Sequence, residues 1–132
     1  MSVNILIVDD SAVMRAMIRK TIELSGLRLG EIHLAADGRE GLAALEKNWI
    51  DLVIADINMP VMNGEEMIDC MQAAPALKSI PTIVVSTEGS RPRIDRLERS
   101  GVRFIHKPFT PEMIRDMVKS VLGGEVFHEP AH

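Results

Sequence analysis

Five short apolar runs recur along the chain, and each is followed by a segment with helical spacing. The runs are Ile5–Val8, Ile32–Ala36, Leu52–Ala55, Thr82–Val85 and Val102–Ile105. They are mostly continuous rather than alternating, which is typical of parallel strands covered by helices on both faces. Strict alternation of strand and helix makes the crossovers right-handed. The sequence therefore predicts a doubly wound (βα)5 sandwich of the α/β class.

The expected helices have recognisable start and stop signals. The first carries an apolar stripe that includes Met14, Met17, Ile18 and Ile22, and Gly26 is placed to end it. The others are expected after Asp37-Gly38 and ending near Asn48, from about Gly64, over Ser90–Arg99, and from a Thr110 N-cap to Gly123-Gly124.

The end of the last helix sets the predicted domain boundary. We expect one domain over residues 1–124 and a disordered tail over 125–132. The tail matches the H-E-x-x-H pattern of zinc proteases at 128–132. That pattern needs a helix to bring its two histidines together. Because a proline lies inside it, we interpret it as tail.

Length and composition exclude several classes of protein. The chain has 132 residues, of which 46% are hydrophobic and 26% charged, as in a globular domain. No apolar run approaches the roughly 20 residues that span a bilayer, so membrane insertion is not expected. The start lacks the features of a signal peptide and Cys70 has no second cysteine to pair with, which predicts a cytoplasmic protein. A net charge of −4 argues against direct DNA binding.

Polar residues end four of the five apolar runs. They are Asp9-Asp10, Asp56, Ser86-Thr87 and His106-Lys107, after the first, third, fourth and fifth run. In a parallel sheet the carboxyl ends of the strands meet at one edge, where ligands bind. Taken singly, each residue has an ordinary explanation: Asp10 or Ser11 would cap the first helix, and Lys107 would be a solvated lysine. Their conjunction predicts a site.

Three carboxylates at one edge repel one another unless they are protonated or bridged by a cation. Oxygen ligands suit Mg²⁺ better than zinc. Lys107 would supply a second positive charge to a phosphate group bound there, and Ser86 a hydrogen bond. A carboxylate in this setting can attack phosphorus and form an acyl phosphate. The spacing thus predicts a Mg²⁺-dependent phosphoryl site, with Asp56 or one of the pair Asp9-Asp10 as acceptor.

The same residues resemble the receiver domain of two-component response regulators. The resemblance covers residues 3–122 and is carried by Val8-Asp9-Asp10, by residues 56–64, by Ser86 and by Lys107-Pro108-Phe109. It is nearest to the single-domain, CheY-like chemotaxis type. It implies a flavodoxin-like sheet of strand order 2-1-3-4-5 and a cis bond between Lys107 and Pro108.

The resemblance also implies roles for individual residues. Asp56 would accept the phosphoryl group from a histidine kinase, and Lys107 would pair with the phosphoryl oxygens. Ser86 would turn inward to the phosphoryl group, and Phe104 would move into the space that this opens. Asp9, Asp10, Asp56 and the backbone carbonyl of Asn58 would bind Mg²⁺.

The implied output is a protein contact, because no effector domain fits within this length. The chain would be a phosphoacceptor switch rather than an enzyme with an external substrate. Its surface formed by the fourth helix, fifth strand and fifth helix would act on a flagellar switch, a kinase or a phosphorelay protein.

The fourth helix itself is unusually basic and offers only Ile94 and Leu97 as clear apolar anchors. Few anchors predict a weakly held helix. Two interpretations of its charge stay open: an ordinary solvated face, or a docking surface for an acidic amphipathic segment. The arginines concerned are Arg91, Arg93, Arg96, Arg99 and Arg103.

Two alternatives come from other classes of protein. A haloacid-dehalogenase-like phosphohydrolase also uses Mg²⁺ and an aspartate nucleophile, but it needs a second aspartate where this chain has Asn58, and room for a cap. A flavodoxin-like electron carrier shares the sheet order. It would need a phosphate-binding loop after the first strand, where Asp9-Asp10 would repel a flavin phosphate.

Overall fold

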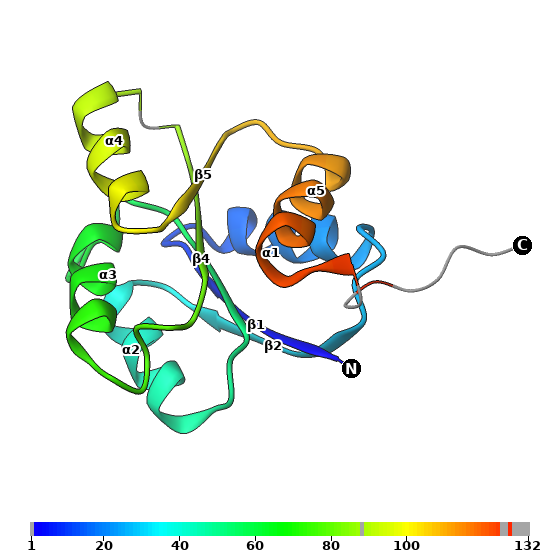
Figure 1. Ribbon diagram of the computed structural model, residues 1–132, viewed down its shortest axis with the longest axis horizontal. Coiled ribbons are helices and arrows are strands. Elements are labelled where there is room, and N and C mark those ends of the chain that lie inside the picture. Colours follow the sequence, from blue (N-terminus) through cyan, green and yellow to red (C-terminus); the bar gives the residue numbers. More distant parts are fainter. Residues whose placement is uncertain (1, 88, 125–126, 128–132) are drawn as a thin grey trace, which may run out of the picture.

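Strands and helices alternate along the chain, as Figure 1 shows for the computed structural model, which describes residues 2–87, 89–124 and 127. The elements are β1 (Val3–Val8), α1 (Ala12–Glu23), β2 (Leu29–Ala35), α2 (Gly38–Lys47), β3 (Leu52–Ala55), α3 (Gly64–Ala73), β4 (Thr82–Ser86), α4 (Arg91–Arg99), β5 (Arg103–His106) and α5 (Pro111–Leu122). The strands form one parallel sheet in the order β2-β1-β3-β4-β5. The predicted fold class and the strand order implied by the resemblance are confirmed.

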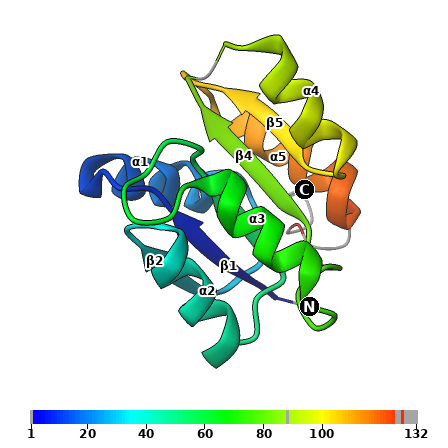
Figure 2. The same cartoon turned by 90° about the vertical axis from the view of Figure 1, so that its left-hand side faces the viewer.

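Helices cover both faces of the sheet. In Figure 1, α1 and α5 lie on one side and α2, α3 and α4 on the other, and Figure 2 views the second side. Side chains of β1 alternate between the two cores: Ile5 and Ile7 pack toward the first side, and Leu6 and Val8 toward the second. All four of these side chains are fully buried, which explains why β1 is an unbroken apolar run in the sequence.

The helix boundaries follow from side-chain caps. Asp37 and Thr110 each accept a hydrogen bond from a backbone N–H of the helix that they precede. Asn63 and Glu66 form a reciprocal capping box at the start of α3. These caps satisfy N–H groups that have no partner inside the helix.

The structure differs from the sequence-based boundaries mainly at β2 and α1. β2 begins at Leu29, three residues before the predicted start, because Leu29 pairs with Val3 of β1. α1 ends at Glu23, and Gly26 follows it in a turn with a φ of 88°. Met17, expected on the apolar stripe, is 55% exposed.

Only one residue of the predicted tail is described. The carbonyl oxygen of Phe127 accepts a hydrogen bond of 3.0 Å from Arg28 Nε, and Phe127 forms an isolated antiparallel bridge with Leu27. The remaining positions of 125–132, which include the H-E-x-x-H pattern, lie outside the described residues. Within the described ranges no helix is both long and apolar enough to cross a membrane.

Candidate functional site

Three carboxylates meet where β1 and β3 end. These strands are neighbours in register, and the backbone N–H of Asp56 donates to the carbonyl oxygen of Val8 over 2.9 Å. This pairing brings the two loops together. One carboxylate oxygen from each of Asp9, Asp10 and Asp56 lies within 4.8 Å of the others. The predicted convergence of the acidic side chains is present in the structure.

Asp9 is the buried member of this cluster, with 1% of its surface exposed. Its Oδ1 accepts a hydrogen bond of 2.9 Å from the backbone N–H of Ser11. Burial raises the pKa of the Asp9 carboxyl above its ordinary value of 3.8, although that hydrogen bond and the nearby Lys107 oppose the shift. The helix-cap role belongs to Ser11, whose hydroxyl accepts from Met14 N, so Asp10 is not needed as the cap.

Lys107 brings a positive charge to the same place from the loop after β5, the edge strand of the sheet. It follows β5, and β4 separates that strand from β3. Its Nζ lies 3.2 Å from Asp9 Oδ2 and 3.5 Å from Asp56 Oδ2, and its side chain is 13% exposed. The bond between Lys107 and Pro108 is cis, as the resemblance implied.

The loop after Asp56 is held close to the strand by Gly64. The N–H of Gly64 donates to the carbonyl oxygen of Ile57 over 2.8 Å. A Cβ atom at Gly64 would lie 2.2 Å from the backbone oxygen of Asp56. A side chain at this position would therefore displace the backbone that carries Asp56.

The two residues assigned to switching lie on adjacent strands. Ser86 ends β4, is 1% exposed, and its carbonyl oxygen accepts from Lys107 N over 3.0 Å. Phe104 on β5 is half-buried, and its ring packs edge-on against His106 with centroids 4.7 Å apart. Phe104 pairs in register with Val84, two residues before Ser86.

The basic residues of α4 and β5 divide into two groups. Arg91, Arg96, Arg99 and Arg103 are exposed, and Arg91 forms an ion pair of 2.6 Å with Asp95. Arg93 turns instead toward the loop after β3, where its Nη1 lies 3.2 Å from the side-chain oxygen of the exposed Asn58.

The sequence did not reveal three contacts of the site. Arg15 Nη1 donates to the backbone oxygen of Asp9 over 2.6 Å, and Arg93 bonds to both Asn58 and Glu65. Helical spacing places Arg15 in the first turns of α1, on the side away from the apolar stripe, and so gives no sign of its contact with Asp9. Nothing in the spacing links Arg93 to Glu65, 28 residues away.

The donor set fits a hard divalent cation. Three carboxylates and one ammonium leave a formal charge of −2, and the cluster identified in the described residues contains oxygen donors only. Mg²⁺ prefers such ligands. The chain thus carries an acidic cluster that is able to hold a metal ion.

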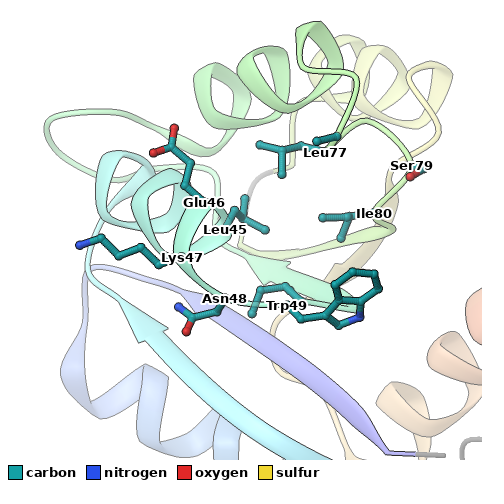
Figure 3. Close-up of a pocket in the computed structure, with 10 residues that line it drawn as sticks. Leu45, Glu46, Lys47, Asn48, Trp49, Leu77, Ser79 and Ile80 are labelled. Atoms are coloured by element: carbon teal, nitrogen blue, oxygen red, sulfur yellow. The ribbon is translucent and has the colours of Figure 1, made fainter.

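An open pocket of about 440 Å³ lies elsewhere, between the end of α2 and the segment before β4. Figure 3 shows the side chains of Leu45, Leu77 and Ile80 around it and the Trp49 ring at its margin. Because the strands are parallel, the start of β4 lies at the opposite edge of the sheet from the carboxylates. This pocket is not part of the site.

Comparison with known proteins agrees with the geometry. The sequence model of the response regulator receiver domain family matches residues 5–119 of this chain. A chemotaxis protein CheY homolog of Campylobacter jejuni is 36% identical over 124 residues, which cover 91% of this chain and 92% of the relative. Chemotaxis protein CheY1 of Helicobacter pylori is 36% identical over 122 residues, with 91% and 97% covered. The solved structure of chemotaxis response regulator CheY4 of Vibrio cholerae has a TM-score of 0.80 and 34% identity, with 92% and 100% covered.

These findings, together with the parallel sheet and the acidic cluster, define a receiver domain. The chain belongs to the response regulator receiver domain family. Within this family it is of the CheY-like type, a signalling domain. The family assignment favours this interpretation over the phosphohydrolase and electron-carrier alternatives.

Proposed function

We propose that this chain is a phosphoacceptor switch, with Asp56 as the residue that a histidine kinase phosphorylates. One observation carries the proposal. Lys107 Nζ lies 3.5 Å from Asp56 Oδ2, while oxygens of Asp9 and Asp10 lie within 4.8 Å of an oxygen of Asp56. A carboxylate beside one ammonium and a cation site is suited to receive a dianionic phosphoryl group.

In the proposed transfer, a carboxylate oxygen of Asp56 forms a bond to phosphorus while the bond between phosphorus and the donor imidazole nitrogen breaks. The imidazole leaves with the electron pair and is protonated by solvent. Lys107 stays protonated and neutralises charge on the phosphoryl oxygens. Asp9, Asp10, Asp56 and the backbone carbonyl of Asn58 would hold Mg²⁺. When bound, Mg²⁺ neutralises the carboxylates and withdraws charge from the phosphoryl oxygens.

The switch would be read at the surface of α4, β5 and α5. The added phosphoryl group brings a charge of about −1.5 to −2 beside the buried Ser86. We propose that the Ser86 hydroxyl donates to it and that Phe104 moves into the space vacated. Such a step shifts an equilibrium between two arrangements of the output surface.

The proposed partner for this surface carries an acidic amphipathic segment. The exposed arginines, Arg91, Arg96, Arg99 and Arg103, support this choice because they present positive charge on a chain whose net charge is −4. A flagellar switch protein, a kinase or a phosphorelay protein would fit. The proposal places these events in the cytoplasm, where a histidine kinase obtains its phosphoryl group from ATP.

Incubation with acetyl phosphate and Mg²⁺, followed by intact-mass measurement, tests the proposal. The wild type should gain one phosphoryl group, and Asp56→Asn should gain none. Asp69→Asn, an exposed acid on α3, is the matched control and should label like the wild type. EDTA and Asp10→Asn should each suppress labelling. A gain that survives Asp56→Asn would place the acceptor elsewhere, and labelling that persists in EDTA would remove the metal from the mechanism.

A further inference from the structure

Arg93 differs from the other arginines of α4 in the direction of its side chain. Its Nη1 donates to Asn58 Oδ1 over 3.2 Å, and its Nε donates to Glu65 Oε1. The side chains of Arg93 and Glu65 are 24% and 22% exposed, so this ion pair is largely shielded from solvent. A charge-assisted hydrogen bond in such a place is stronger than an exposed pair.

The two partners of Arg93 lie near the two ends of the phosphoacceptor loop, residues 57–64. Asn58 follows Asp56 by two residues, and Glu65 is in the first turn of α3. Gly64 closes this loop onto Ile57 and approaches the backbone of Asp56 too closely for any side chain. Arg93 therefore connects α4 to both ends of a loop that packs directly against the backbone of the acceptor, Asp56.

α4 has few other contacts that fix its position. Only Ile94 and Leu97 of this helix are buried. Most of its remaining residues are exposed. Elements with few buried contacts open at low free energy, so one shielded ion pair has a large effect on the order of such a helix.

We propose that Arg93 is a positioning residue that couples the order of α4 to the conformation of the phosphoacceptor loop. The proposal rests on the proposed function in one respect, that phosphorylation of Asp56 is the event that alters the loop. The new negative charge near Asn58 attracts the guanidinium and weakens its hold on Glu65. Because coupling between two sites is reciprocal, the position of α4 in turn affects the loop. This route is separate from Ser86 and Phe104.

Hydrogen–deuterium exchange of the α4 amides, measured on the full chain, tests this coupling. Arg93→Gln is compared with Arg99→Gln, which removes the same charge from an exposed position of the same helix. Without phosphodonor, Arg93→Gln should exchange about two- to fivefold faster than wild type over residues 91–99, and Arg99→Gln should not. Glu65→Gln should match Arg93→Gln, and combining the two should add nothing further. Equal exchange in Arg93→Gln and Arg99→Gln would overturn the proposal.

A second arm repeats the measurement after incubation with acetyl phosphate and Mg²⁺, with intact mass recorded on the same samples. Labelling should change α4 exchange in the wild type and in Arg99→Gln, and should change it less in Arg93→Gln. An equal response in both variants would overturn the coupling. If the wild type gains no phosphoryl group, the proposed function fails, while the comparison without phosphodonor still decides whether Arg93 orders α4.

Discussion

Lys107 and Asp56 are 51 residues apart in the chain, and the strand β4 lies between the strands that carry them, yet Lys107 Nζ lies 3.5 Å from Asp56 Oδ2. The same ammonium lies 3.2 Å from the buried Asp9. One cation therefore offsets repulsion between two carboxylates from different loops. The arrangement makes the stability of the protein depend on what neutralises these acids.

Replacing Lys107 by Met should remove the counter-charge from the buried Asp9 and from Asp56, whose side chain is 13% exposed. We expect the free energy of unfolding to fall by about 3 kcal/mol in EDTA, measured by urea denaturation. Mg²⁺ should recover more stability in Lys107→Met than in the wild type, because it replaces the lost positive charge. Lys119→Met, at an exposed position of α5, is the control and should behave like the wild type. An equal gain of stability from Mg²⁺ in Lys107→Met and in the wild type would contradict the assignment of Lys107 as the counter-charge of these carboxylates.

The raised pKa of Asp9 gives a pH dependence of defined sign. Burial disfavours the charged carboxyl, so the folded state holds its proton to a higher pH than the unfolded state does. The stability associated with protonated Asp9 is present below its ordinary value of 3.8 and is lost as the pH rises through the raised folded-state value. In EDTA, wild type should therefore lose stability relative to Asp9→Asn as the pH increases. Urea denaturation of both proteins at each pH measures this, and a difference that grows in the opposite direction would contradict it.

Gly64→Ala should damage the site and the fold together. The new Cβ would lie 2.2 Å from the carbonyl oxygen of Asp56, so the loop must move. We expect a loss of at least about 1–3 kcal/mol in the free energy of unfolding and reduced labelling by acetyl phosphate. Gly89→Ala is the matched control, because a Cβ there would meet no atom within 4 Å. Similar stability of the two variants would show that the loop tolerates the displacement.

Charge reversal on the exposed face of α4 should separate partner binding from phosphorylation. The double substitution Arg96→Glu and Arg99→Glu should leave acetyl phosphate labelling unchanged. Both side chains are exposed, and α4 packs on the core through Ile94 and Leu97 instead. Affinity for an acidic partner segment should fall at least tenfold at low salt, and less at high salt. Titration of the phosphorylated protein with that segment at two salt concentrations measures both effects. Unchanged affinity would leave α4 as an ordinary solvated face.

Most of the fold could be predicted because its strands are continuous apolar runs and its helices carry clear caps. The same logic located Asp9, Asp10, Asp56 and Lys107, since each directly follows a strand of a parallel sheet. The start of β2 could not be predicted, because Gly30 and Glu31 are exposed and lie at an irregularity in the pairing with β1. Only the pairing of Leu29 with Val3 extends the strand back to residue 29.

The orientation of the Arg93 side chain could not be predicted from the sequence for a different reason. Helical spacing separates the buried Ile94 and Leu97 from the exposed side of α4, but an arginine next to the buried stripe can turn either way. Its direction depends on Glu65 and Asn58, which the fold brings near from another element. Sequence alone grouped Arg93 with the four exposed arginines.

The most direct test of the central proposal is to locate the phosphoryl group chemically. Borohydride reduces an acyl phosphate to an alcohol, so a phosphorylated aspartate becomes homoserine. After incubation with acetyl phosphate and Mg²⁺, reduction and peptide mass sequencing should find homoserine at position 56 and at no other. Homoserine at position 9 or 10, or phosphate retained on Ser86, would contradict the assignment of Asp56 as the acceptor.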